Sequence, residues 1–381
     1  MRFEVKRVAI IHPWLPQYRV PFFEELKILC DGAGIELDVF YGAPPPEWKG
    51  RNDSATSSTA SLLPTRFIPF LGRHFIYKSL KPLGRLSDYD LIIVEQAIRN
   101  LESYALLIRA RKRIAFWGHG KSYSGKKNFL EEMLKTSITN LGSWFFGYTS
   151  DGVEAVVARG FDAARITAVQ NSIDTRALAG YLSEVTEDEL NRFKSSHSLT
   201  DSTALFIGGV DRAKRIDFLI AAARYAHTLD PAFRLLVAGD GNDRDMITSV
   251  ANQEPWLKFL GPVRGKEKAL ALKSARAIAI PGAVGLVAVD SLVSGVPIVT
   301  TTNAEHGPEF DYLSPGHNSM IVADRPEVYA RALLQIVSDG KNAKVFSLNC
   351  LAERSKYSIS RMCNNFFEGI VSALEMTRKN S

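Results

Sequence analysis

Short apolar runs recur along the whole chain with turn residues at their ends, and this rhythm constrains the fold more than any other feature of the sequence. Longer mixed segments lie between most of them. The runs lie at 7–12, 35–42, 90–96, 113–117, 144–149 and 166–170 in the first half, and at 203–208, 233–238, 257–260, 275–280, 297–302 and 318–323 in the second. Continuous apolar strands that alternate with helices form parallel sheets covered on both faces. The sequence therefore predicts an α/β fold.

The length of 381 residues exceeds what one hydrophobic core usually holds. We expect two Rossmann-like, doubly wound domains at 1–175 and 203–358, joined by a polar linker with a short helix at 176–202. Apolar residues near helical spacing in 359–381 predict a last helix that packs back on the first domain. Two such domains facing each other across a crevice would place ligands at the carboxyl ends of their strands.

The composition excludes several classes of protein. Hydrophobic residues make up 46% of the chain and charged residues 23%, as in soluble globular proteins. We expect a cytoplasmic protein, because no apolar run is long enough to span a membrane and no signal peptide precedes the first strand. The three cysteines lack a CxxC pair, which predicts reduced thiols and no metal site. The net charge is +6, and the sequence has no nucleic-acid-binding motif. The positive charge therefore points to phosphorylated substrates or an anionic membrane as binding partners.

The segment 281–300 has the pattern of a strand end, a glycine turn, a short helix and a new strand. Such a turn leaves three backbone N–H groups unpaired at a helix N-terminus, where a phosphate binds readily: Gly285, Leu286 and Val287. Asp290 follows about one turn later and is expected to accept hydrogen bonds from a ribose. The alternative is an ordinary turn between a buried strand and a helix.

Three cations follow the apolar run at 203–208, at Arg212, Lys214 and Arg215. They could neutralise a diphosphate leaving group. A solvated basic helix start is the alternative, but positive charge at a helix N-terminus is unfavourable, which argues for a bound anion.

Three further loops follow buried strands. His119 lies between two glycines after the strand at 113–117; a lone histidine in such a place is more often structural. Val263 and Arg264 follow the strand at 257–260. His306 and Glu309 bring an imidazole and a carboxylate to the end of the strand at 297–302, and a loop capped by Pro308 is the alternative.

The order and spacing of several motifs resemble those of the family 4 glycosyltransferases of bacteria. The shared motifs lie at 12–23, 117–120, 147–149, 171–174, 238–241 and 281–300. This resemblance covers almost the whole chain and implies the GT-B fold, in which two Rossmann-like domains face each other.

The resemblance also implies roles for individual residues. In the family, a histidine at the position of His119 contacts the transferred sugar near the reacting carbon, which implies a positioning and electrostatic role. The loop with Val263 and Arg264 would lie against the nucleotide base. Lys214 matches the family's diphosphate lysine. The family's arginine is replaced by Gly209, so Arg212 is the candidate substitute.

The chain departs from the family at the phosphate turn. Members carry two glutamates eight positions apart, and here the second is Asp290 and the first is Gly282. Because glycine has no side chain to contact a sugar hydroxyl, we hypothesise that Glu309 or His306 makes that contact instead.

Basic and aromatic residues interleave between Arg66 and Arg85, and no acidic residue occurs between Ser54 and Ser87. The basic residues are Arg66, Arg73, Lys78, Lys81 and Arg85. This pattern predicts contact with an anionic bilayer that holds a lipid-linked acceptor. A partly buried loop and helix with solvated lysines is the alternative.

We therefore expect a retaining glycosyltransferase that needs neither metal nor cofactor and works at the inner face of the cell membrane. It would move a sugar from a nucleotide diphosphate sugar to a glycan or lipid-linked acceptor in bacterial surface polysaccharide assembly. Two alternatives remain open: a nucleotide-sugar epimerase of the same fold, and a non-catalytic partner of another transferase, which Gly209 and Gly282 would favour. The donor sugar, its base and the linkage stay open.

Overall fold

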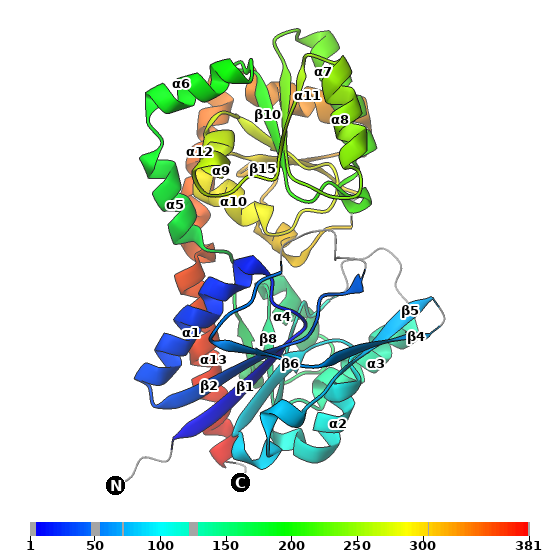
Figure 1. Ribbon diagram of the computed structural model, residues 1–381, viewed down its shortest axis with the longest axis vertical. Helices are drawn as coiled ribbons and strands as arrows, with labels where there is room; N and C mark the ends of the chain where they lie inside the picture. Colours follow the sequence, from blue (N-terminus) through cyan, green and yellow to red (C-terminus); the bar gives the residue numbers. More distant parts are fainter. Residues whose placement is uncertain (1–4, 47–53, 71, 122–128, 304, 380–381) are drawn as a thin grey trace. The chain divides into compact units, whose positions relative to one another are not determined.

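A computed structural model describes residues 5–46, 54–70, 72–121, 129–303 and 305–379 of the chain. The chain divides into two compact units (Figure 1). Unit 1 comprises Met1–Ile173 together with Ile359–Ser381, and unit 2 is the uninterrupted stretch Asp174–Ser358.

Unit 1 is built on a parallel sheet of strand order β3-β2-β1-β6-β7-β8-β9. The strands are β1 Lys6–His12, β2 Ile35–Tyr41, β3 Ala60–Leu62, β6 Leu91–Glu95, β7 Ile114–Gly118, β8 Trp144–Gly147 and β9 Ile166–Ala168. The strand order reverses between β1 and β6, as in doubly wound folds. The helices of this unit are α1 Val20–Gly32, α2 Leu101–Ala110, α3 Phe129–Asn140, α4 Ser150–Val157 and α13 Ile359–Lys379.

Helix α13 completes the core of unit 1. It packs along α1, and its Phe366 ring stacks on Phe146 with centroids 4.4 Å apart. The same ring meets Trp117 at 4.9 Å. Because Phe366, Met362 and Ile370 are fully buried here, the last helix is an integral part of the first unit.

The basic and aromatic stretch of unit 1 forms an antiparallel hairpin of β4 Thr65–Phe70 and β5 Arg73–Lys78 (Figure 1). The alternative of a loop and helix is therefore wrong. Lys78 is buried, and its Nζ lies 2.7 Å from Oε1 of Glu102 on α2. This ion pair removes Lys78 from the basic residues that a membrane could contact.

Unit 2 is built on a second parallel sheet, of strand order β12-β11-β10-β13-β14-β15. The strands are β10 Thr203–Ile207, β11 Arg234–Ala238, β12 Leu257–Gly261, β13 Ala277–Ala279, β14 Ile298–Thr301 and β15 Ser319–Val322. The helices are α5 Thr175–Glu184, α6 Glu187–Ser196, α7 Ile216–Leu229, α8 Arg244–Gln253, α9 Gly265–Lys273, α10 Val287–Ser294, α11 Pro326–Val337 and α12 Gly340–Glu353. Each strand predicted from an apolar run is present within two residues of its expected ends.

The stretch 176–202, expected to be a linker with a short helix, holds two helices and belongs to unit 2. Helices α5 and α6 pack on α9 of unit 2, where Val185 and Leu190 form a small apolar cluster with Ala269. Thr186 starts α6 with a capping box, since its hydroxyl accepts from the backbone N–H of Glu189. The stretch looks irregular in the sequence because these helices bury only a narrow apolar stripe.

Candidate functional site

The candidate site of unit 2 lies where its strand order reverses, between β10 and β13. The order β12-β11-β10-β13-β14-β15 places these two strands side by side although they are not consecutive in the chain. Ligands of open parallel sheets bind outside the carboxyl ends of the strands at this point. The loop 208–215 follows β10 and the loop 280–286 follows β13, so both predicted phosphate segments lie at the reversal.

The loop after β10 makes a short 3₁₀ turn, Arg212–Lys214, before α7 begins. Asp211 starts this turn, because its Oδ1 accepts from the N–H of Ala213 at 3.1 Å. The half-buried Lys214 reaches the neighbouring loop, where its Nζ donates to the carbonyl oxygen of Ala283. Its ammonium therefore lies beside the turn that precedes α10.

The three cations of this loop have different surroundings. Arg215 has a left-handed backbone, with φ of 58°, and its guanidinium forms an ion pair with Asp324. It therefore has a structural role in unit 2. Arg212 is exposed, which leaves Lys214 and Arg212 as the candidates to contact a diphosphate.

Gly282 is glycine because the backbone of the first loop packs directly against it. A Cβ at this position would lie 2.3 Å from the carbonyl oxygen of Ala213 and 2.5 Å from the Cα of Lys214. The neighbouring Ala283 donates its N–H to the same carbonyl oxygen at 2.8 Å. The space that a glutamate side chain would enter is thus occupied by main chain.

The N-terminus of α10 is open. The helix starts after Leu286 without a side-chain cap. Within the described part of the chain, three successive backbone N–H groups donate to no protein acceptor: Gly285, Leu286 and Val287. Unpaired N–H groups and the helix dipole together favour an anion at this end.

Asp290 lies buried in the first turn of α10 and forms an ion pair that the sequence did not suggest. Its Oδ1 lies 2.6 Å from Nζ of Lys268, one turn into α9. The lysine orients the carboxylate and offsets its charge at the start of the helix. Lys268 follows the proposed base loop by a few residues, and that closeness is the only signal that could have pointed to it.

Both ring nitrogens of His306 are engaged by backbone, so the predicted contact with the donor sugar would need one of these hydrogen bonds to break; that contact stays a prediction. Its Nδ1 accepts from the N–H of Val284 at 3.2 Å, and its Nε2 donates to the carbonyl oxygen of Thr301 at 2.9 Å. Burial, and to a lesser degree the charge of Lys214, lowers the pKa of His306, although the Thr301 hydrogen bond opposes this. A neutral imidazole therefore ties the phosphate turn to the end of β14.

Glu309 is buried beside the phosphate turn. Its Oε2 lies 3.7 Å from the point that a Cβ at Gly285 would occupy, and 3.2 Å from the corresponding point at Gly307. Gly307 also donates its N–H to the carbonyl oxygen of Val284 at 2.6 Å. The loop after β14 thus brings this carboxylate to the phosphate turn, as the compensation hypothesis requires; its contact with a sugar stays a prediction.

Val263 and Arg264 lie at the carboxyl end of β12, the edge strand. Arg264 is exposed and precedes α9, while Val263 is half-buried. The same helix carries Lys268, the partner of Asp290, so this loop is linked to the phosphate turn through one ion pair. The role of Val263 and Arg264 at a base stays a prediction.

His119 belongs to unit 1, where it directly follows β7. It is exposed, and its ring meets Tyr148 edge-on with centroids 4.7 Å apart. The protein atoms around it, and next the charge of Lys135, lower the pKa of His119, so the imidazole is neutral at pH 7. A neutral ring with an accessible surface can donate or accept one hydrogen bond to a ligand, and can also accept a proton.

Known proteins resemble this chain in part of its sequence and in its fold. Residues 201–339 match a family described as Glycosyl transferases group 1. No curated protein matches the chain. HepE of Anabaena, solved in complex with UDP, is 14% identical with a TM-score of 0.66, and the alignment covers 96% of this chain and 100% of HepE. The fold is GT-B.

Two other solved structures have the same fold. Sucrose-phosphate synthase from Thermosynechococcus elongatus is 17% identical with a TM-score of 0.62, and 98% of each chain is covered. WaaG, a glycosyltransferase involved in lipopolysaccharide biosynthesis, is 12% identical with a TM-score of 0.62, covering 95% of this chain and 98% of WaaG. The family match contains the whole site of unit 2, from Arg212 to Glu309. Together these findings support a GT-B glycosyltransferase.

Proposed function

We propose that this protein is a retaining glycosyltransferase that takes its sugar from a nucleotide diphosphate sugar bound by unit 2. Family 4 membership is part of this proposal, on the motif resemblance. The acceptor would be a glycan, carried on a lipid at the inner face of the cell membrane during surface polysaccharide assembly. The description of WaaG as involved in lipopolysaccharide biosynthesis is in keeping with such a role.

One observation carries the proposal: a cation and an open helix N-terminus meet at the strand-order reversal of unit 2. The ammonium of Lys214 lies beside the turn from which three backbone N–H groups project. Cations and oriented N–H groups stabilise a diphosphate strongly, since charge-assisted hydrogen bonds exceed neutral ones in strength. Asp290, held by Lys268, provides a carboxylate for ribose hydroxyls in the next turn.

Lys214, Arg212 and the α10 N-terminus would take the charge that a metal ion bears in other transferases, so we expect transfer to persist when divalent cations are chelated. His119 would contact the transferred sugar from unit 1. The chemistry needs no other cofactor, because the leaving group is already a nucleotide diphosphate.

The test is a thermal-shift screen of the intact protein with UDP-, GDP- and dTDP-sugars, because a ligand that binds only the folded state raises the unfolding midpoint. Lys214→Ala should weaken the affinity for the matching nucleotide diphosphate roughly ten- to hundredfold, since one charge-assisted contact contributes about 1.5–3 kcal/mol. Lys344→Ala, on the exposed side of α12 in the same unit, is the matched control and should bind normally.

Two outcomes would contradict the proposal. The intact protein could fail to respond to every nucleotide sugar, or Lys214→Ala could bind as tightly as the intact protein. Formation of an epimer from donor alone, without acceptor, would instead identify an epimerase.

A further inference from the structure

Helix α3 of unit 1 exposes most of its large apolar side chains. Its outward face consists of large apolar side chains, with 78% of Phe129, 66% of Leu130, 53% of Met133 and 45% of Leu134 exposed. A surface helix of a globular protein normally turns its apolar stripe toward the core and its polar residues toward water. Here the apolar stripe faces away from the protein.

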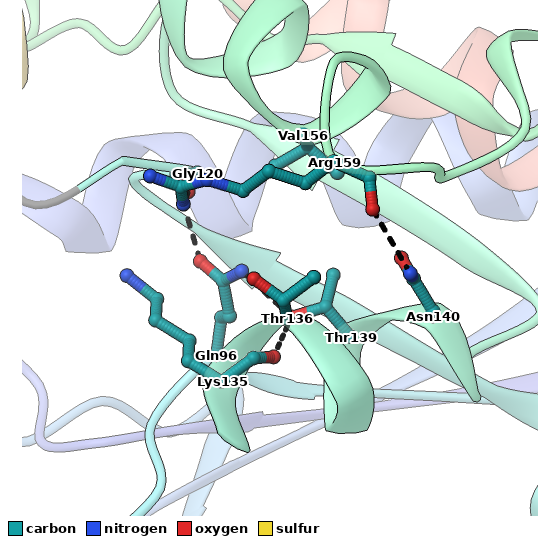
Figure 2. Close-up of a pocket in the computed structure, with 8 residues that line it drawn as sticks. All are labelled: Gln96, Gly120, Lys135, Thr136, Thr139, Asn140, Val156 and Arg159. Atoms are coloured by element: carbon teal, nitrogen blue, oxygen red, sulfur yellow. Dashed lines mark hydrogen bonds between the residues drawn. The ribbon is translucent and has the colours of Figure 1, made fainter. Parts of the chain in front are cut away.

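Apart from Ile138, which packs on the core, the inward side chains of α3 are polar, and their contacts fix this orientation (Figure 2). Lys135, Thr136, Thr139 and Asn140 line a cavity of about 10 Å³, roughly the space of one water. Gln96 donates to Oγ1 of Thr139 at 2.8 Å, and Asn140 donates to the carbonyl oxygen of Arg159 at 3.2 Å. Rotating the helix to bury its apolar residues would break these hydrogen bonds.

The β4–β5 hairpin adds a second apolar face next to α3. Its register pairs Arg66 with Tyr77, Ile68 with Phe75 and Phe70 with Arg73, and alternation along each strand places these six side chains on one face. The opposite face carries Lys78, which pairs with α2. Of the six, Phe70 is 58%, Ile68 45% and Tyr77 40% exposed.

An ion pair between Arg73 of the hairpin and Glu131 of α3 joins the two elements. We refer to the outward residues of α3 together with the six-residue face of the hairpin as the α3–hairpin surface. Exposed apolar patches of this kind mark sites where a protein contacts a partner or a membrane.

The charges of the α3–hairpin surface favour an anionic membrane over a second copy of this chain as its partner. The hairpin face carries Arg66 and Arg73 and no carboxylate. The two acidic residues in the first turn of α3 are both neutralised, Glu131 by Arg73 and Glu132 by Arg159 at 3.1 Å. Aromatic and aliphatic side chains flanked by arginines match the layered chemistry of a lipid bilayer with anionic headgroups. A second copy packed on the same patch around a twofold axis would bring the arginines of both copies together.

We propose that the α3–hairpin surface is the membrane-binding surface of this protein, with the apolar residues of α3 inserted below the headgroups of an anionic leaflet and Arg66 at the headgroup level. This proposal deepens the proposed function, because it gives the surface through which a lipid-linked acceptor would be approached. Vesicle binding is measured without any donor, so failure of one proposal leaves the other standing.

The experiment is flotation of the full chain with vesicles of phosphatidylcholine, with and without phosphatidylglycerol. The intact protein should float with the anionic vesicles only, and increasing salt should weaken the association. Phe129→Glu combined with Met133→Glu should weaken partitioning by about tenfold or more, because burial of each large apolar side chain is lost. Arg66→Glu should weaken binding to anionic vesicles, and the binding that remains should change less with salt concentration.

The matched control is Ile108→Glu, which introduces the same charge at an 86% exposed isoleucine on α2, outside the surface. It should bind vesicles as the intact protein does. Equal thermal midpoints for all variants would show that the substitutions leave the fold intact. Intact protein that never floats, or a Phe129→Glu/Met133→Glu variant that floats normally, overturns the proposal. Concentration-dependent dimers that the double variant abolishes, in the absence of vesicle binding, would assign the surface to self-association.

Discussion

Gly282 is one of two glycines, with Gly209, at which the chain departs from the glycosyltransferases it resembles, and its surroundings explain the glycine. The backbone of Ala213 and Lys214 fills the space beside its Cα. The glycine therefore lets the loop that carries Lys214 dock against the phosphate turn. Loss of the side chain is thus compatible with an intact diphosphate site.

We predict that Gly282→Ala weakens the binding of UDP, or of whichever nucleotide diphosphate binds the intact protein, at least about tenfold. A Cβ at 2.3 Å from a carbonyl oxygen forces the loops apart, and overpacking of this kind costs about 1–3 kcal/mol. Isothermal titration calorimetry measures the effect. Gly340→Ala, at the start of α12 in the same unit, is the control, since nothing lies within 4 Å of the point its Cβ would occupy. Normal affinity in Gly282→Ala would show that the two loops need not touch.

The sequence was informative about the backbone of this site and much less about its side chains. The turn at 285–287 and Lys214 were predictable, because glycines and a strand end fix where main-chain N–H groups project. The partner of Asp290 was not, since Lys268 comes from another helix and only the packing of α9 brings it near. The backbone partners of His306 were not predictable either, since the N–H of Val284 lies on another loop and only the fold brings it and the carbonyl oxygen of Thr301 to the two ring nitrogens.

At the scale of elements, the buried pair of Lys78 and Glu102 fastens the hairpin to α2. Glu102 accepts hydrogen bonds from both Nζ and the backbone N–H of Lys78. Both side chains are 2% exposed, so each charge depends on the other. A buried charge that loses its partner is strongly unfavourable, whereas removal of both charges together often is not.

We therefore predict that Glu102→Leu lowers the free energy of unfolding by about 3–5 kcal/mol, and that Lys78→Met in the same chain restores most of this loss. Urea denaturation of the two single variants and the double variant measures the coupling. If the double variant is as unstable as the sum of the single ones, the pair is not coupled and the hairpin is held by its apolar contacts.

The central strands of both sheets were predictable because they are apolar on both faces, a pattern that local sequence displays fully. The hairpin was not, because its strands mix arginines, aromatics and Pro69, and their pairing depends on contact with α2. Helix α3 shows the same limit. Its apolar and polar residues have helical spacing, but the sequence does not say which face turns inward.

For the molecule as a whole, α13 returns to unit 1 and completes its core. Phe366→Ala should destabilise unit 1 by about 3–5 kcal/mol, because it removes a ring packed on Phe146, Trp117 and Phe22. Thermal unfolding with and without a nucleotide should show the loss in the transition that the nucleotide does not shift. A loss confined to the nucleotide-shifted transition would place the effect in unit 2 and contradict the packing.

The path of the chain through its two units also determines the order in which they can complete folding during translation. Unit 2 leaves the ribosome as one uninterrupted piece, Asp174–Ser358, whereas unit 1 lacks its closing helix until α13 has emerged. At common translation speeds this interval lasts roughly 10–40 s. During it, Phe22, Trp117 and Phe146 have no Phe366 to cover them, so the half of the protein that is made first is the half that finishes folding last. Nascent chains paused within unit 2 should therefore be clients of hydrophobic-surface-binding chaperones.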